Sequence, residues 1–433
     1  MDVYTPAMAT DVIEGIGDAL GPAVAAVFSG CFLDTLEHTI ALSAGGSAFV
    51  VTGDIPAMWL RDSTVQLTPY LHFLERDPKL AQSAIAVSRR QLACIDRDPY
   101  ANAFNQGPDG AGHWSDQTEM SPWVWERKYE VDSLAYPVQL AYDIWTLTGR
   151  TEHLELFPTV ARSIVGVWRT EQDHDQTSSY RFERPGSPGD SLARRGLGRP
   201  TGHTGLTWSA FRPSDDTCVY NYNVPANMLA FVELSHIAEL ADAVFDDWEL
   251  AADARDLRDS IGRGLTGYAV TTGPSQEPVY AYELDGLGGV LVMDDANTPS
   301  LLSLPLIGWC ELDDPLYQRT RAFLLSEANP TFSRGAAAAG IGSPHTPPGS
   351  IWPIALAVQG LTALDHGERD RMLSTLMATH ADTDRMHESF DKDDPTIYTR
   401  PWFSWANAMF CELALDCAGM RTYRRTAAGT VLR

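Results

Sequence analysis

The stretch DSLAYPVQLAYDIWTLTG, residues 132–149, shows the pattern that decides the fold class. Leu140, Ile144 and Leu147 recur at helical spacing, and Gly149 follows as a stop signal. The same periodicity returns along the chain, so we expect about twelve helices. The other segments are 12–27 (as one helix), 65–74, 79–95, 151–170, 225–242, 246–264, 301–310, 315–326, 351–363, 367–380 and 402–417.

Long loops rich in Gly, Pro and aromatic residues separate these segments. Loops of such length in a compact domain generally carry function. Strand-like runs at 48–52 and 266–272 are short, so they predict small hairpins and not a central sheet. The loops cover 96–127, 171–223, 267–299, 327–350 and 382–401.

An all-helical chain of this kind can form an α-solenoid or an α/α toroid. A solenoid requires a sequence repeat of about 30–45 residues, and this sequence shows none. We therefore predict an all-α (α/α)6 toroid or barrel, in which six outer helices surround six inner ones, with long functional loops and a few short hairpins. Because no linker of the inter-domain kind interrupts the chain, residues 1–433 are predicted to form one domain.

The composition excludes several classes of partner. Lys and Arg number 32 and Asp and Glu 57, for a net charge of −25, which repels nucleic acid and anionic membrane surfaces. The 6 cysteines show no CxxC or zinc-ligand spacing and are expected to be reduced and buried. No apolar run of about 18 residues occurs, and Asp2 stands where a signal peptide carries a basic residue. We expect a cytoplasmic protein of unknown oligomeric state.

Polar and aromatic residues gather in five clusters at loops and helix starts. Four of the five clusters place a carboxylate near a Trp or an Arg, as sugar binding requires: hydroxyls pair with carboxylates and Arg, and the C–H face of a sugar stacks on a ring. Any single Trp is still expected to be core packing, but the set favours a sugar site. The clusters lie at 54–62, 125–133, 205–216, 343–353 and 387–407, and the Trp residues in or beside them are Trp59, Trp123, Trp125, Trp208, Trp352, Trp402 and Trp405.

Hydrolysis of a glycosidic bond needs two carboxyl groups, one as acid and one as base or nucleophile. Asp215 and Asp216 are adjacent, and two like charges raise the pKa of one of them, although a helix cap or a solvated turn is the alternative interpretation. Glu388 precedes an acidic loop and could instead form a surface ion pair. The sequence contains no GxSxG, HExxH or P-loop motif, and its histidines are too dispersed to indicate a metal site.

Several motifs, in order along nearly the whole chain, together resemble glycoside hydrolase family 125. The resemblance implies an (α/α)6 exo-α-mannosidase that removes non-reducing-end α-1,6-linked mannose with inversion and needs no metal or other cofactor. Its expected partner is a mannose-containing oligosaccharide. The motifs are DIPAMWLRDS (54–63), KYEVDSLAYP (128–137), GLTWSAFRPSDD (205–216), DDANTPSLLSLP (294–305), SPH (343–345) with IWP (351–353), HESF (387–390) and PWFSWANAMF (401–410).

The resemblance also implies roles for individual residues. Glu388 in HESF is the expected base, and the acid is Asp215 or Asp216 in RPSDD, with Asp215 the first choice. The residues expected to bind substrate are Trp59, Arg61, Asp62, Lys128, Glu130, Asp132, Trp208, Arg212, Asn297, Ser303, His345, His387, Trp402 and Trp405.

The expected mechanism is a single displacement by water. Asp62, Arg61 and Glu130 grip the terminal mannose. Asp215 protonates the glycosidic oxygen, and Glu388 takes a proton from water on the opposite face, which requires carboxyl groups about 6.5–9.5 Å apart. Two alternatives remain: another (α/α)6 exo-glycosidase, such as an α-glucosidase-like enzyme, and a non-catalytic carbohydrate-binding protein.

Overall fold

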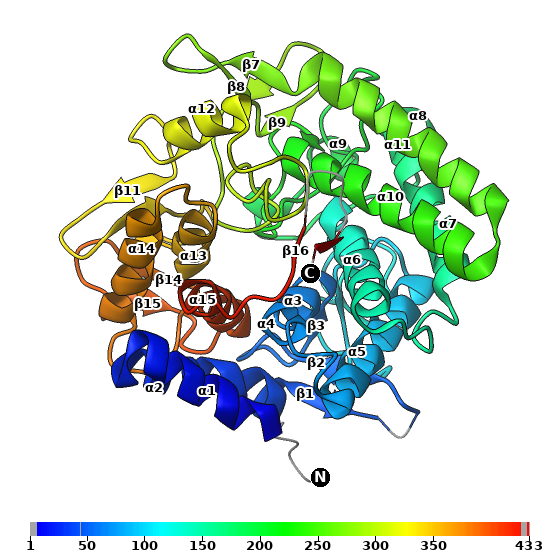
Figure 1. Cartoon of the computed structure of the whole chain (residues 1–433). Coiled ribbons are helices and arrows are strands. Elements are labelled where there is room, and N and C mark those ends of the chain that lie inside the picture. Colours follow the sequence, from blue (N-terminus) through cyan, green and yellow to red (C-terminus); the bar gives the residue numbers. More distant parts are fainter. Residues whose placement is uncertain (1–6, 44, 426–430, 433) are drawn as a thin grey trace.

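Helices in two concentric layers close into a ring around a central axis (Figure 1). The structure, a computed structural model, describes residues 7–43, 45–425 and 431–432. Asp2 and both ends of the domain predicted over 1–433 lie outside these residues. The predicted all-α (α/α)6 barrel is confirmed.

The inner layer consists of segments that are buried on nearly all sides. Such segments read as apolar all round, which is typical of helices inside a protein. Five of the six positions are helical, and turns at 302–308 take the remaining one. The inner helices are α3 (Leu60–Val65) with α4 (Thr68–Leu71), α6 (Val131–Thr148), α10 (Val224–Phe245), α13 (Pro353–Leu361) and α15 (Ser404–Cys417).

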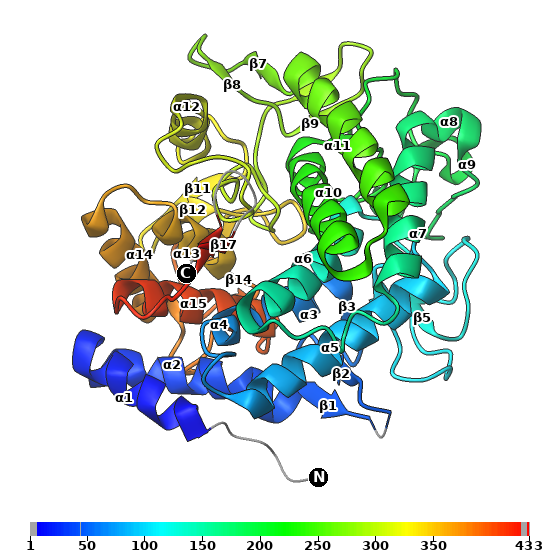
Figure 2. The ribbon, with the colours of Figure 1, turned by 45° about the vertical axis from the view of Figure 1, so that its right-hand side comes forward.

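The outer helices each bury one face against the inner layer, as α10 and α11 show side by side in Figure 2. Many begin with a Pro in the first turn, where its missing N–H costs nothing, and Asp77 and Asp365 cap their helices by accepting backbone N–H groups. The outer helices are α2 (Pro22–Asp34), α5 (Pro78–Arg97), α7 (Phe157–Thr170), α11 (Trp248–Tyr268), α12 (Pro315–Leu324) and α14 (His366–Thr379), with α1 (Ala7–Leu20) packed on α2.

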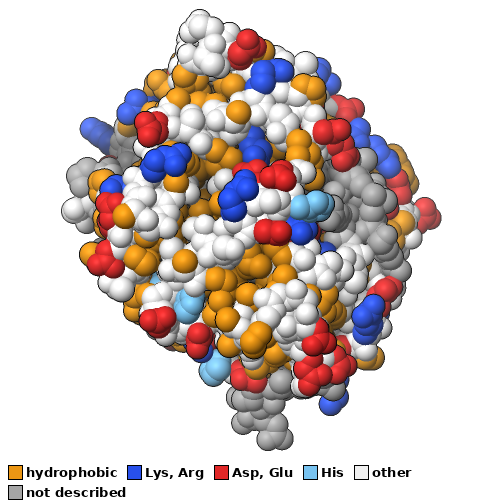
Figure 3. All heavy atoms as spheres, turned by 60° about the vertical axis from the view of Figure 1, so that its left-hand side comes forward, with side chains coloured by type: hydrophobic (Ala, Val, Ile, Leu, Met, Phe, Trp, Pro, Cys, Tyr) orange, Lys and Arg blue, Asp and Glu red, His pale blue; other side chains and the backbone are white. Residues whose placement is uncertain are grey.

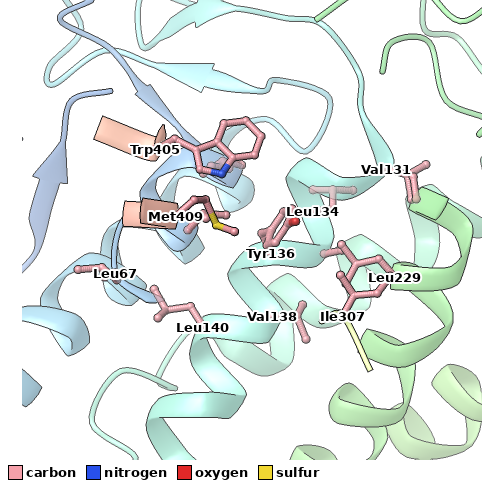
Figure 4. Packing of buried hydrophobic residues seen from close by; sticks show 14 of the residues in the cluster. Leu67, Val131, Leu134, Tyr136, Val138, Leu140, Leu229, Ile307, Trp405 and Met409 are labelled. Carbon is pink, nitrogen blue, oxygen red and sulfur yellow. The ribbon is translucent and has the colours of Figure 1, made fainter. Parts of the chain in front are cut away.

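A single hydrophobic cluster holds the two layers together. Leu134 and Tyr136 of α6 lie near Met409 of α15 and Leu229 of α10 (Figure 4). The cluster reaches from Ala9 to Tyr423, and a single domain over 1–433 stays a prediction.

Short strands form small sheets at the ends of the barrel. Three of these sheets have three strands, and each leads into an inner helix: β3 into α3, β6 into α10 and β13 into α13. The sheets are β3 (Met58–Trp59), β4 (Ala103–Phe104) and β5 (Val124–Glu126); β6 (Tyr222–Asn223), β9 (Glu283–Leu284) and β10 (Val290–Leu291); and β13 (Ser350–Ile351), β14 (Ser389–Asp391) and β15 (Tyr398–Thr399).

Two-stranded hairpins and short helices occupy other connections. The predicted hairpins at 48–52 and 266–272 exist, although 266–268 belongs to α11. The hairpins are β1 (Ile40–Leu42) with β2 (Ala48–Val50), β7 (Val270–Thr272) with β8 (Pro278–Tyr280), β11 (Phe332–Arg334) with β12 (Ala339–Ile341), and β16 (Arg424–Arg425) with β17 (Val431–Leu432); the short helices are α8 (His174–Thr177) and α9 (Ala193–Gly196).

The predicted helix at 65–74 is present only in part, as the last residue of α3 and the four residues of α4, with turns at 66–67 and 72–74. Two other helix predictions are wrong. The segment 12–27 is not one helix, because Gly21 adopts a left-handed φ of 93° and Pro22 starts a new helix. The segment 301–310 forms turns instead of a helix: Pro305 removes a donor, and the Asp294 carboxylate accepts the N–H groups of Leu301 and Leu302. In both places the local breaker outweighs the apolar periodicity.

The surface carries charges of both signs between apolar patches on the face shown in Figure 3. None of the helices in the described ranges is long and apolar enough to cross a lipid bilayer.

Candidate active site

A pocket lies where the inner helices begin. Trp59, Trp352 and Phe403 stand at the N-terminal caps of α3, α13 and α15, and their rings form part of its wall. The cavity volume of the pocket is about 130 Å³. Its lining is Ile55, Trp59, Arg61, Asp62, Pro213, Ser214, Asp215, Asn297, His345, Trp352, Glu388, Arg400, Phe403 and Trp405.

Asp215 reaches the pocket from a tightly held loop. Its backbone has a positive φ of 66°, which is uncommon for a residue other than Gly and is retained where neighbouring contacts enforce it. Lys128 Nζ donates to the Asp215 carbonyl oxygen at 2.7 Å, and Asn102 Nδ2 donates to Oδ1 at 3.3 Å. The loop is fastened behind by Arg212, whose Nε donates to Glu283 Oε1 at 2.5 Å.

Asp216 points elsewhere. Its Oδ1 lies 3.2 Å from Nδ1 of His345, and its Oδ2 accepts a hydrogen bond from Ser214. Burial lowers the pKa of His345, but the hydrogen bond and charge of Asp216 outweigh burial and raise that pKa to about 9. His345 is therefore a cation at neutral pH, and it faces the pocket while Asp216 does not line it.

Glu388 reaches the pocket from another segment, directly before β14. Its N–H donates to the Thr399 carbonyl at 3.3 Å, and Arg400 Nη1 lies 3.8 Å from its Oε1. The following segment is anchored by the buried Asp34, whose Oδ2 accepts hydrogen bonds from Trp402 Nε1 at 2.7 Å and from Ser404 Oγ at 3.0 Å. Glu388 is thus a buried carboxyl group on a fixed strand, facing the pocket.

Arg61 is the electrostatic centre of the site. Its Nη1 donates to Glu130 Oε2 at 2.8 Å and to Asp132 Oδ2 at 3.0 Å, and its Nη2 lies 3.5 Å from Asp215 Oδ1. Burial lowers the pKa of Arg61, but these carboxylates outweigh burial and hold it above its usual value. A permanent cation therefore sits beneath the carboxyl groups of the pocket.

Asp62 is a carboxyl group whose negative charge is disfavoured by its buried surroundings. Burial raises its pKa to about 6, although Arg61 acts in the opposite direction. Among the described residues, Asp62 Oδ2 and the indole Nε1 atoms of Trp59 and Trp405 are buried without a hydrogen-bond partner. Asp62 Oδ2 still lies 3.5 Å from Arg61 Nε, within ion-pair distance. Buried polar atoms normally have partners, so the two indole N–H groups are the ones left to pair with a bound ligand.

The structure brings together about half of the residues that the sequence predicts for the site. Several others stand directly behind the lining and hold it: Lys128 and Arg212 fix the loop of Asp215, while Glu130 and Asp132 fix Arg61. The predicted residues that line the pocket are Trp59, Arg61, Asp62, Asp215, Asn297, His345, Glu388 and Trp405.

Two residues predicted to bind sugar, Trp208 and Ser303, do not line this pocket. Trp208 is fully buried and stacks on His174 with ring centroids 3.7 Å apart. Ser303 bonds within its own turn to Ser300. Each lies outside the pocket lining because its side chain already has neighbours elsewhere.

Two further predicted residues, His387 and Trp402, also lie behind the lining. His387 stacks on Tyr398 with ring centroids 3.7 Å apart, and Trp402 donates to Asp34. Their contacts shape the segment around Glu388, so direct contact with a sugar in this pocket is not supported for either residue.

Sequence reasoning missed several lining residues. Arg400 and Phe403 form a cation–π pair, 4.5 Å from guanidinium carbon to ring centroid, beside Glu388. Ile55, Pro213, Ser214 and Trp352 complete the lining, and of these only Trp352 was named, as one of the Trp set. All six residues lie within the five clusters, so membership of a cluster was the signal that could have found them.

The described residues contain no group of three or more His, Cys, Asp and Glu side chains placed to hold a metal ion.

Comparison with known proteins identifies the family. The profile of the family described as "Metal-independent alpha-mannosidase (GH125)" matches residues 21–415. The chain belongs to this family. Because GH125 proteins are α-mannosidases, the pocket that Asp215 and Glu388 line is the candidate active site of an α-mannosidase.

Two relatives resemble this GH125 chain closely. A structure from Streptococcus pneumoniae, described as a metal-independent α-mannosidase in a non-productive substrate complex with α-1,6-mannobiose, is 47% identical, with a TM-score of 0.95 over 97% of this chain and 100% of that chain. The Meiotically up-regulated gene 157 protein of Schizosaccharomyces pombe is 38% identical over 422 residues, 91% of this chain and 82% of the relative.

A more distant likeness concerns the fold alone. A bacterial glucoamylase solved with acarbose aligns with a TM-score of 0.61 at 11% identity, over 97% of this chain and 58% of that chain.

Proposed function

We propose that this GH125 protein is an exo-acting glycoside hydrolase that removes α-1,6-linked mannose from non-reducing ends with inversion of configuration. The observation that carries the proposal is that Asp215 and Glu388, from loops far apart in the sequence, line one pocket with Trp59 and Trp405. The α-mannosidase description of the family and the α-1,6-mannobiose in the S. pneumoniae relative support the substrate class.

The terminal mannose would be held by the unpartnered groups of the pocket. Trp59 and Trp405 offer ring faces to the C–H surface of the sugar and free indole N–H groups to its hydroxyls. Asp62 offers a carboxylate to one or two hydroxyls, and its rigid position at the start of α3 supplies orientation. Desolvated polar atoms of this kind favour a ligand with several hydroxyl groups.

Asp215 is the proposed general acid. It lines the pocket, whereas Asp216 is engaged by His345 and Ser214. Protonation of the glycosidic oxygen by Asp215 lets the bond from C1 to that oxygen break, with the electron pair going to the leaving sugar.

Glu388 is the proposed general base. As a carboxylate it takes a proton from a water molecule whose oxygen bonds to C1 on the face opposite the leaving group. Its place in the pocket lining, on a segment far from the loop of Asp215 in the sequence, supports this role. One displacement of this kind releases β-mannose.

A direct assay tests the proposal. The protein is incubated with α-1,6-mannobiose and, separately, with the α-1,6-linked glucose disaccharide, and the released monosaccharide is quantified. Release of mannose alone is expected, and release of glucose would favour an α-glucosidase-like enzyme. Glu388→Gln is the control, and full turnover by this variant would contradict the assignment of Glu388 as the base. If the wild type binds sugar without turnover, the protein is a carbohydrate-binding protein instead.

The cellular setting stays a prediction from sequence. The acidic composition supports a neutral oligosaccharide as partner, and a cytoplasmic location stays a proposal.

A further inference from the structure

Arg400 connects the proposed base with a carboxylate outside the pocket. Its Nη1 lies 3.8 Å from Glu388 Oε1, while its Nε and Nη2 both donate to Asp54 Oδ1, at 2.9 and 2.5 Å. Among the residues that the structure describes, this is the only ion pair that Glu388 makes. Arg400 and Glu388 line the pocket, and Asp54 does not.

The backbone at Arg400 is held in an uncommon conformation. Arg400 has a positive φ of 41°, which residues other than Gly seldom adopt and which persists where the surrounding structure enforces it. The enforcing contacts come from a segment far away in the sequence. The Asp54 N–H donates to the Trp402 carbonyl at 3.3 Å, and the Thr52 carbonyl accepts a hydrogen bond from the Ser404 N–H at 3.1 Å. These bonds fix the point from which the Arg400 side chain starts.

The side chain of Arg400 is held as well as its backbone. Its guanidinium carbon lies 4.5 Å from the centroid of the Phe403 ring, and its Nη2 donates to Thr52 Oγ1 at 3.4 Å. A guanidinium is planar and carries its N–H groups in a fixed fork, so the two hydrogen bonds to Asp54 determine where Nη1 lies. They place this end of the cation beside Glu388.

An ordinary surface ion pair does not account for this arrangement. Exposed pairs contribute little because water and salt screen them, but the side chain of Glu388 is only 9% exposed and that of Arg400 is 21% exposed. Asp54 also supplies a negative charge that offsets the charge of Arg400. The cation therefore holds Glu388 without leaving a net positive charge beside a group that must accept a proton.

We propose that Arg400, held by Asp54, is a positioning residue that orients the Glu388 carboxylate toward the attacking water. This inference rests on the proposed function, in which the water oxygen bonds to C1 while a proton of that water passes to Glu388. Arg400 itself neither gives nor takes a proton. A carboxylate that turned freely would meet the water in the productive geometry less often, and even a small misplacement of a catalytic group slows a reaction strongly.

The test is a double-mutant cycle on Arg400 and Glu388. Arg400→Gln, Glu388→Gln and the double variant are compared with the wild type on 2,4-dinitrophenyl α-mannoside. The leaving group of this substrate departs without a proton and is coloured, so slow turnover by the Glu388 variants can be followed. Arg97→Gln is the matched control, because Arg97 also stacks on an aromatic ring, 4.3 Å from the centroid of Trp123, but does not line the pocket. Melting curves establish that each variant folds.

The expected result is a loss of kcat that depends on Glu388. Arg400→Gln should lower kcat by about ten- to a hundredfold and change KM by less than about twofold, as a misplaced catalytic group does. In the Glu388→Gln background the same substitution should lower kcat by less than about twofold, because residues that act as a unit are not additive. Arg97→Gln should match the wild type. An equal loss in both backgrounds, or a rise in KM with kcat unchanged, would indicate a contact with the sugar and would overturn the inference.

A second substitution separates the charge of Arg400 from its shape. Arg400→Lys keeps the charge but replaces the fork by a single ammonium group, which cannot bind Asp54 and reach Glu388 in the same way. Its kcat should fall nearly as far as that of Arg400→Gln, and a wild-type kcat would contradict the inference. If Arg400→Gln does not fold, Arg400→Lys takes its place in the cycle. Should turnover of the Glu388 variants be too slow to follow, the division of the loss between kcat and KM decides.

The cycle also keeps failure of this inference apart from failure of the proposed function. Full turnover by Glu388→Gln contradicts the base assignment on which the inference rests. A low kcat for Glu388→Gln together with an unchanged kcat for Arg400→Gln contradicts the role of Arg400 alone.

Discussion

Replacing Asp62 by Asn is expected to raise the free energy of unfolding and to lower the catalytic activity. Asp62 is fully buried, lines the pocket, and keeps an oxygen without a hydrogen-bond partner among the described residues. The negative charge of Asp62 is placed to bind a ligand. In the ligand-free protein the same buried charge lowers the free energy of unfolding. The neutral amide of Asn has the same shape and removes this cost.

The pKa of Asp62 sets the size of the effect. Burial raises it from 3.8 to about 6, and at about 1.36 kcal/mol per pKa unit this difference corresponds to at most about 3 kcal/mol at pH 7. The favourable contribution of the protonated group is complete below pH 3.8 and is lost as the pH rises through 6. The gain in the free energy of unfolding for Asp62→Asn should therefore be largest above pH 6 and should vanish towards pH 4.

The assay is urea unfolding of the wild type and Asp62→Asn at several pH values between 4.5 and 8, with kcat/KM measured on α-1,6-mannobiose. A hydrogen bond to a charged group contributes about 1.5–3 kcal/mol, so kcat/KM should fall by about ten- to a hundredfold. Asp132→Asn is the contrast: it loses a 3.0 Å bond to Arg61 and should be less stable than the wild type. A destabilised Asp62→Asn, or a gain that does not change with pH, would refute the reasoning.

Further predictions concern the carboxyl groups and one glycine. Asp215→Asn and Glu388→Gln should each lower kcat on the disaccharide by at least about a hundredfold with little change in melting temperature, because Asn tolerates the positive φ at 215; normal turnover by either variant would contradict its role. Asp216→Asn should lower the pKa of His345, now about 9, as followed by NMR titration of the imidazole; an unchanged value would show that the pairing is unimportant. Gly53→Ala should destabilise by more than about 1 kcal/mol, since φ is 126° and an added Cβ would lie 2.4 Å from the Trp402 carbonyl oxygen; unaltered thermal unfolding would argue against this close approach.

The helical layers could be predicted from the sequence because burial and periodicity coincide in them. The segment 132–147 is α6 with one residue added at each end, and 225–242 extends to α10 at 224–245. Periodicity failed where a single residue overrides it, at Gly21 with Pro22 and at the turns around Pro305. Such breaks depend on backbone angles and on carboxylate caps from elsewhere, such as Asp294, which a stripe of apolar residues does not contain.

The sequence predicted which residues belong to the site better than it predicted the role of each residue. Motifs located Asp62, Asp215 and Glu388, which line the pocket. They could not separate Asp62, which points into the pocket, from Glu130, which points at Arg61, because both are carboxylates at helix starts. The choice between Asp215 and Asp216 likewise depends on loop geometry, and the support for Asp215 comes from its place in the pocket lining. Trp208 shows the same ambiguity for an aromatic residue. It belongs to a motif, but its side chain packs in the core.

Proton NMR of the first sugar released tests the central claim most directly, that Asp215 and Glu388 act on opposite faces of one mannose in a single displacement. Spectra recorded within the first turnovers on α-1,6-mannobiose, before mutarotation, should show the β-anomer of mannose first, with the α-anomer appearing later. Initial release of the α-anomer would mean two displacements and a covalent intermediate, and would contradict the account.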